Sequence, residues 1–192
     1  FPAHVSAAPR TRDIVSGDFW WIGETSGTKL IAVADCTGHG VPGAFMSLIG
    51  NTALNEIVKE KHISDPGEIL NRLSQYIVAS LKQENKEKAD PEMMKSVKDG
   101  MDIALCSIDE KSGVLKYAGA NNPLYYVENG ILKEIKGDRQ PVGVFAGNIK
   151  PFVTHTVPLK DLEAFYIFSD GYADQFGGPA SKKFKYAQLQ SL

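Results

Sequence analysis

One stretch of the sequence constrains the fold more than any other, because an apolar strand there ends in a carboxylate and continues into a glycine-rich loop. The run Leu30–Ala34 has the composition of a buried strand, and Asp35 ends it. Pro42 then suits the first turn of a helix. The stretch that leads from Asp35 into the helix contains three glycines: Gly38, Gly40 and Gly43. A carboxylate in this position is costly to desolvate unless it is paired or binds a metal ion, so the stretch indicates metal or phosphate chemistry.

Two further carboxylates have similar surroundings. Asp170 follows the apolar run Phe165–Phe168 and precedes Gly171, and Asp18 follows Gly17 and precedes aromatic residues. Ligands that are all carboxylates favour a hard cation such as Mg²⁺ or Mn²⁺. A pair of such ions can activate a bridging water and clamp a phosphate for in-line attack. Hydrolysis of a phosphoester is therefore the predicted reaction class.

Structural roles for the same residues stay open. Asp35 could cap the turn that follows it, and Asp18 could be a turn acid. Asp174, four residues after Asp170, could join the site, cap a helix or lie in solvent. The glycine loop could be a plain connector, and it is not a Walker loop because no Lys followed by Ser or Thr ends it.

Three other polar residues also have two interpretations. His39 could protonate a leaving oxygen as a general acid, or orient the loop through a hydrogen bond. Arg12 could hold a substrate phosphate, or be a solvated surface cation. Asp102 lies inside an apolar strand, where a buried acid needs a partner, and its role is undecided between support of the metal site and capping of a loop.

Composition excludes several classes of protein. The chain has 192 residues, 43% of them hydrophobic and 23% charged, as expected of one globular domain. A net charge of −2 does not favour nucleic acid or an anionic membrane. The longest apolar runs are far shorter than the roughly 20 residues that a membrane helix needs. Two cysteines make no disulfide framework, which fits a reducing cytosol.

The order of the predicted elements favours an α+β fold. We expect strands over Asp18–Gly23 and Lys29–Asp35, helices over Pro42–Lys61 and Pro66–Gln83, and strands over Met101–Ile108, Val114–Gly119, Leu124–Val127, Ile131–Ile135, Phe152–Val157 and Ala164–Ser169. Ser64 or Asp65 can cap the second helix. Strands and helices do not alternate, so antiparallel sheets with an outer pair of antiparallel helices fit best. Residues 82–99 are charged and predicted to form a mobile loop or a frayed helix end, with a docking insert as the functional alternative.

Four segments carry a resemblance to a known family: Asp13–Trp20, Val33–Met46, Tyr117–Pro123 and Phe168–Gly171. With these motifs the chain resembles the metal-dependent serine/threonine protein phosphatases of the type 2C, or PPM, family. Within that family it is most similar to the bacterial branch typified by the stage II sporulation phosphatase. The resemblance implies a four-layer α-β-β-α sandwich of two antiparallel sheets flanked by helices. It also implies a site for two Mn²⁺ or Mg²⁺ ions at one edge of the sheets.

The resemblance also implies roles for single residues. Asp35 would bridge both ions, Cys36 would offer its backbone carbonyl, and Asp170 would bind one ion. Asp18 would be a ligand or would hold a metal-bound water, and Asp174 matches a position that helps bind a third, weaker ion. The candidate contacts to the substrate phosphate are Gly38, Gly40 and Arg12. His39 lies two residues further from the bridging acid than the corresponding histidine of eukaryotic members, and is the candidate general acid.

One departure from the family concerns the C-terminus. Members of the family end in a strand that carries a further metal-binding Asp, whereas this chain stops at Leu192 before any such motif. We therefore expect a single phosphatase domain over residues 1–192, incomplete at its C-terminal end and lacking that last strand. Weakened metal binding would follow.

The resemblance implies a cytoplasmic phosphatase that removes phosphate from phosphoserine or phosphothreonine by means of a metal-activated water. It would be the output domain of a bacterial signalling protein, which could itself be attached to a membrane. The implied partners are an upstream sensor domain and a phosphorylated protein such as an anti-sigma-factor antagonist, and a homodimer is left open. A catalytically silent domain that binds a partner is the alternative. A metal-dependent nuclease is a weaker one, because the pI is about 6.1 and no basic stripe is present.

Overall fold

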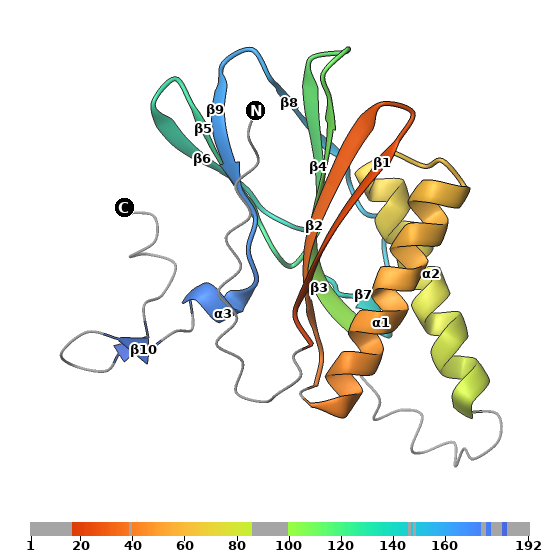
Figure 1. Cartoon of the computed structure of the whole chain (residues 1–192). Helices are drawn as coiled ribbons and strands as arrows, with labels where there is room; N and C mark the ends of the chain where they lie inside the picture. The colour runs from red at the N-terminus through yellow and green to blue at the C-terminus, as the bar shows by residue number, and fades with distance from the viewer. Residues whose placement is uncertain are drawn as a thin grey trace.

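Two antiparallel sheets lie face to face in the computed structural model, and a pair of helices covers the outer face of the larger one (Figure 1). The structure describes residues 17–38, 40–85, 100–145, 147, 149–173, 176–177 and 182–183. These residues form three layers: the helix pair, the larger sheet and the smaller sheet. The α+β fold class with two antiparallel sheets is thereby confirmed. Within the described ranges, no long helix forms the fourth layer outside the smaller sheet.

The larger sheet has six strands. They are β1 (Phe19–Thr25), β2 (Thr28–Cys36), β3 (Gly100–Asp109), β4 (Val114–Ala120) and β8 (His155–Pro158) in spatial order, with β7 (Val142–Gly143) paired to the start of β3. Every neighbouring pair is antiparallel. Ser26 and Gly27 close the β1–β2 hairpin with positive φ angles of 52° and 81°, which suits a two-residue turn.

The smaller sheet has three strands in the order β6 (Ile131–Ile135), β5 (Leu124–Glu128) and β9 (Leu162–Tyr166). The chain leaves β9 for the four-residue helix α3 (Asp170–Ala173). A short hairpin of β10 (Phe176–Gly177) and β11 (Lys182–Lys183) follows. The segment 167–169 was predicted to be strand, but it lies outside β9 because the chain there turns towards α3.

The helices match their predicted positions closely. The first is α1 (Val41–Asn55), which continues as a π-helical turn, η1 (Glu56–Glu60), and the second is α2 (Pro66–Asn85). Figure 1 shows α2 running back alongside α1 in the opposite direction, as predicted. Residues 86–99, most of the predicted mobile loop, lie outside the described residues. Of the helices that the structure describes, none is both long and apolar enough to cross a membrane.

Strand β3 joins two hydrophobic cores because its side chains alternate between the two faces of the larger sheet. Ile103 and Leu105 belong to the core beneath α1 and α2, whereas Ala104 and Cys106 belong to the core between the sheets. All four are fully buried. The same alternation decides on which face of the sheet each acid of this strand lies.

One predicted strand begins later than expected. Residues 152–154 were predicted to belong to a strand, but β8 begins only at His155. Side chains bind this backbone in place of a neighbouring strand: Phe152 N–H donates to Asn71 Oδ1 at 3.0 Å, and Val153 N–H donates to Asp138 Oδ2 at 2.9 Å. These bonds satisfy the backbone without a sheet, and the apolar pattern of the sequence does not reveal them.

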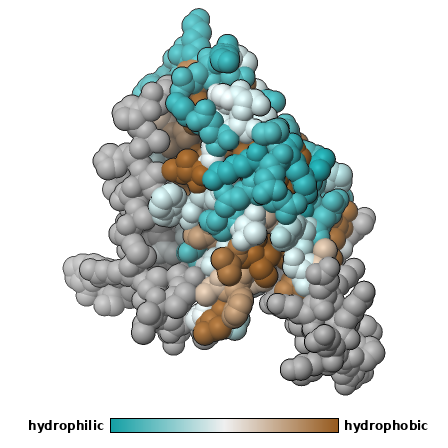
Figure 2. Space-filling view, turned by 45° about the vertical axis from the view of Figure 1, so that its right-hand side comes forward, coloured by the Kyte–Doolittle hydropathy of each residue, from teal (hydrophilic) through white to brown (hydrophobic). Residues whose placement is uncertain are grey.

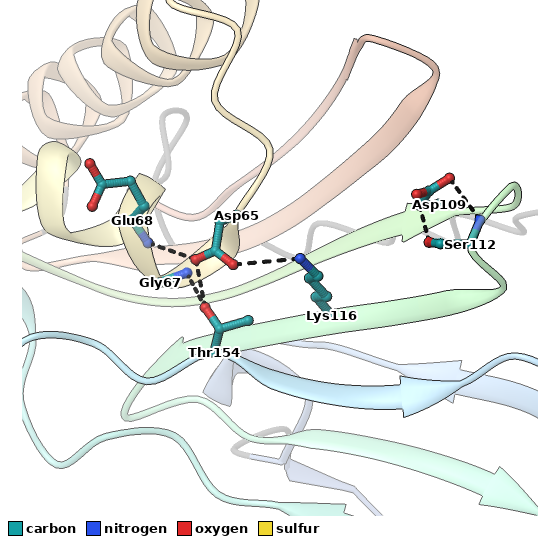
Figure 3. A network of polar contacts seen from close by, with 7 residues as sticks. All are labelled: Asp65, Gly67, Glu68, Asp109, Ser112, Lys116 and Thr154. Carbon is teal, nitrogen blue, oxygen red and sulfur yellow. Dashed lines mark hydrogen bonds and ion pairs between the residues drawn. The ribbon is translucent and has the colours of Figure 1, made fainter.

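Asp65 ties the start of α2 to the larger sheet (Figure 3). Its Oδ1 accepts hydrogen bonds from the N–H of Glu68 at 3.2 Å and from Thr154 Oγ1 at 2.7 Å. Thr154 Oγ1 in turn accepts from the N–H of Gly67 at 2.9 Å. Lys116 of β4 lies 3.8 Å from Asp65 Oδ2. Of the two predicted caps, Asp65 is therefore the one that the helix uses.

The surface over the helices is mainly polar. Figure 2 shows hydrophilic residues over much of this face and hydrophobic residues in separate groups. Three large hydrophobic residues of α1 are more than half exposed, at 65% for Val41, 60% for Phe45 and 63% for Leu48. Their spacing places them on one side of the helix.

Substituting Asp65 by Ala should lower the free energy of unfolding by about 1–2 kcal/mol, because the change removes the cap of α2 and its bond to Thr154. Urea denaturation followed by circular dichroism measures this. Asp161→Ala, at an exposed turn, is the control and should change the free energy of unfolding by less than about 0.5 kcal/mol. Equal effects of the two substitutions would contradict the capping role.

Candidate metal centre

Asp35 occupies the face of β2 that points away from the helices. Leu30, Ala32, Ala34 and Cys36 belong to the core beneath α1 and α2. Because side chains alternate along a strand, Asp35 lies on the opposite face, towards the smaller sheet. It is half-buried. The carboxylate is thus held near the end of a central strand, at the margin of the space between the sheets.

The structure brings Asp18 and Asp170 to Asp35, as the sequence predicted. Phe19 is paired with Ala34, so Asp18 comes directly beside the end of β2. Asp170 is the first residue of α3, and the residue before it, Ser169, donates a hydrogen bond from Oγ to Asp18 Oδ2 at 2.8 Å. Two strand ends that are far apart in the sequence therefore meet at one edge of the sheets.

The three carboxylates interact strongly. Burial first, and then hydrogen bonding to Asp170 and the negative charge of Asp18, together raise the pKa of Asp35 to about 8. Among the described residues, no three acidic, histidine or cysteine side chains are arranged to enclose a metal ion as they stand. Asp18 and Asp170 instead each interact with Asp35 separately. A bound cation would relieve the repulsion that keeps Asp35 protonated.

Glycines let the loop after β2 pack backbone against backbone. A Cβ atom on Gly17 would lie 3.0 Å from the carbonyl oxygen of Cys36, and one on Gly43 would lie 2.7 Å from the carbonyl oxygen of Gly38. Gly38 and Gly40 also have positive φ angles of 90° and 63°. Side chains at these positions would push the loop apart, so the start of α1 could not lie against Gly17.

The thiol of Cys36 is not a candidate ligand. It is buried in the core on the helix side of β2. Burial and the charges of Asp35 and Asp18 raise its pKa to about 12, so the thiol stays protonated. Cys36 could contribute only its backbone carbonyl, and that role stays a prediction. The available donors are then all oxygen atoms, which fits Mg²⁺ or Mn²⁺ better than zinc.

Three of the predicted site residues lie outside the described residues: His39, Asp174 and Arg12. Their roles stay predictions. The backbone positions of Gly38 and Gly40 agree with a loop that a ligand can approach closely, and phosphate binding there likewise stays a prediction.

Sequence reasoning did not single out two residues beside the acids. Ser169 binds Asp18, and only its place next to Asp170 pointed to it. Asn121 donates a hydrogen bond from Nδ2 to Asp102 Oδ1 at 2.7 Å, and Asp102 is paired with Asp35 across β2 and β3. The Asn-Asn-Pro turn was a visible signal, but its contact with Asp102 depends on strand pairing.

A family model described as Stage II sporulation protein E (SpoIIE) matches residues 25–192. The chain is similar in structure to the SiaA-PP2C domain of Pseudomonas aeruginosa, with 30% identity and a TM-score of 0.74, over 94% of this chain and 66% of that one. The PP2C phosphatase domain of SpoIIE from Bacillus subtilis is 17% identical, with a TM-score of 0.59, over 85% of this chain and 44% of that one. No curated protein gives a significant match.

RsbX in complex with magnesium has the same fold, with 16% identity and a TM-score of 0.56, over 94% of this chain and 79% of that one. This likeness and the one to the Bacillus protein are evidence of fold alone. The chain spans slightly less than two thirds of the length of the SiaA-PP2C chain.

The raised pKa of Asp35 predicts how stability depends on pH when metal is removed by EDTA. The folded-state pKa of about 8 lies above the ordinary 3.8, so this group's stabilising contribution is complete at low pH and is lost as the pH rises towards 8. We expect Asp35→Asn to flatten this decline between about pH 5 and about pH 9, and to raise the free energy of unfolding at the upper end by about 1–2 kcal/mol.

Urea denaturation at both pH values measures this change, with Asp161→Asn as the control at an exposed turn. Parallel pH curves for the wild type and Asp35→Asn would contradict the assigned ionisation of Asp35.

Proposed function

Because the chain belongs to the stage II sporulation protein E (SpoIIE) family, we propose that it is a Mn²⁺- or Mg²⁺-dependent phosphatase acting on phosphoserine or phosphothreonine in a protein. Its PP2C-type fold supports a phosphatase. The observation that carries the proposal is the convergence of Asp18 and Asp170 on the half-buried Asp35.

Each residue of the site has its own proposed role in binding the cations. We propose that Asp35 would bind both ions of a pair and that Asp170 would bind one ion. Asp18 would bind an ion or hold a metal-bound water, and the Cys36 carbonyl would complete the set. The bound ions would supply an activated water and neutralise the charge of the phosphate. Ser169 fixes the orientation of the Asp18 carboxylate through its hydrogen bond. Asp174 is proposed as a ligand of a further, weaker ion.

The loop after β2 is part of the proposed binding site for the substrate phosphate. We propose that the backbone at Gly38 and Gly40, close to the start of α1, and the side chain of Arg12 hold the substrate phosphate. His39 is proposed to give a proton to the leaving oxygen of the serine or threonine. None of these groups forms a covalent bond to phosphorus in this scheme.

The relatives suggest the biological setting. Solved structures similar in fold to this chain include one of the RsbU and RsbW domains of a Mycobacterium tuberculosis protein, 43% of which is covered, and one from work on the bacterial stressosome. We propose that this chain acts in bacterial signalling, in the cytoplasm, on a phosphorylated regulatory protein such as an anti-sigma-factor antagonist. An upstream sensor domain and a homodimer are proposed partners in that setting.

Hydrolysis of p-nitrophenyl phosphate and of a phosphoserine peptide by the full chain with Mn²⁺ tests the proposal. Asp35→Asn and Asp170→Asn should each lower kcat/KM by roughly 100-fold or more, because each removes a charge that the cations need. EDTA should abolish turnover of both substrates. Asp161→Asn, a matched change at an exposed turn, should leave turnover unchanged.

Two results would overturn the proposal. One is a wild-type chain that binds Mn²⁺ but turns over neither substrate, which is the behaviour of a catalytically silent domain. The other is turnover that persists unchanged in Asp35→Asn, which would place the reaction elsewhere.

A further inference from the structure

A fourth carboxylate lies on the same face of the sheet as Asp35. The register of β2 and β3 pairs Asp35 with Asp102, and the flanking pair Ala34 and Ile103 faces the helix-side core. Directly paired side chains of antiparallel strands project from the same face, with Cβ atoms about 4.5–5.5 Å apart. Asp102 is therefore a near neighbour of the acidic site and is half-buried there.

Asn121 holds Asp102 from a rigid turn. Its Nδ2 donates to Asp102 Oδ1 at 2.7 Å. The backbone of Asn121 has a φ of 58°, which Asn and Gly tolerate best, and its N–H donates to the carbonyl of Asp138 at 2.8 Å. Asp138 N–H donates in turn to the carbonyl of Gly119 at 2.8 Å. The turn thus presents the amide group of Asn121 to the carboxylate in a fixed direction.

The charge on Asp102 has no cation to balance it in the part of the chain that the structure describes. No Lys or Arg there forms an ion pair with Asp102. Burial raises the pKa of Asp102, the hydrogen bond from Asn121 lowers it, and the charge of Asp170 raises it. A half-buried carboxylate beside other acids is costly unless a cation joins them.

We propose that Asp102, held by Asn121, is a positioning residue of the metal site that adds a fourth negative charge beside Asp35 and so strengthens cation binding there. The inference rests on the proposed metal-dependent function. Asp102 acts through the cation and Asp35, and does not touch the substrate phosphate. The ligand it serves is a hard divalent cation, because the neighbouring donors are oxygen atoms.

A purely structural role for Asp102 can be separated from this one. If Asp102 only anchors the turn of Asn121 to β3, any acceptor at position 102 suffices. Asp102→Asn keeps an oxygen that can accept the bond from Asn121 and removes only the charge. Asn121→Gly keeps the positive φ angle of the turn and removes only the amide group. These two variants therefore test charge and orientation one at a time.

The experiment is titration of the full chain with Mn²⁺, with the free ion counted by electron paramagnetic resonance. Asp102→Asn should weaken Mn²⁺ binding about 10-fold, and Asn121→Gly should weaken it by a smaller factor. The double variant should bind Mn²⁺ as Asp102→Asn does, because Asn121 acts through Asp102. Glu110→Gln removes the same charge at an exposed turn after β3, where Glu110 meets Lys29, and should bind like the wild type.

Thermal unfolding in EDTA completes the test. The proposal expects Asp102→Asn to unfold at the wild-type temperature or above it, since a half-buried charge is removed. Wild-type Mn²⁺ affinity in Asp102→Asn, with or without a lower unfolding temperature, would overturn the positioning role and leave the proposed function intact. A wild-type chain that binds no Mn²⁺ would overturn the proposed function and this inference together.

Discussion

The partial burial of Asp35 is the constraint on which the rest of the site depends. Apolar neighbours fix the face on which Asp35 lies, since every second residue of β2 is needed in the core beneath the helices. The carboxylate then has limited access to water and carries a pKa of about 8 as a result, first of burial and then of its acidic neighbours. A protein optimised for stability alone would not place Asp18 and Asp170 there. Such local destabilisation is typical of functional sites.

The loop after β2 links this constraint to the helices. Thr37 binds Gly100 through three contacts: its N–H and Oγ1 donate to the Gly100 carbonyl at 3.0 and 3.1 Å, and Oγ1 accepts from the Gly100 N–H at 3.0 Å. Close backbone contact between Gly43 and Gly38 then sets where α1 begins. The acidic site, the start of β3 and the first helix are therefore fixed to one another over a few residues.

The sequence predicted the features that depend on local pattern. Asp35 and Asp170 were recognisable because each follows an apolar run, and Asp65 because it precedes a helical pattern. The contacts of Asp102 and the late start of β8 were beyond prediction. The first depends on pairing between strands that are far apart in the sequence, and the second on the side chains of Asn71 and Asp138, which bind a distant backbone. The roles of His39, Asp174 and Arg12 remain predictions.

The pairing of Asp35 with Asp102 has a consequence for how this protein can change over time. Because side chains alternate, a shift of β2 by one residue against β3 would turn Asp35 towards the helices, leave Asp102 on its present face, and bring core residues of β2 to the site. A single-residue insertion or deletion within β2 would thus exchange the side chains that face the helix-side core with those that face the smaller sheet. Lineages of this chain should therefore vary in length at the β1–β2 turn around Ser26 and keep the length of β2 unchanged.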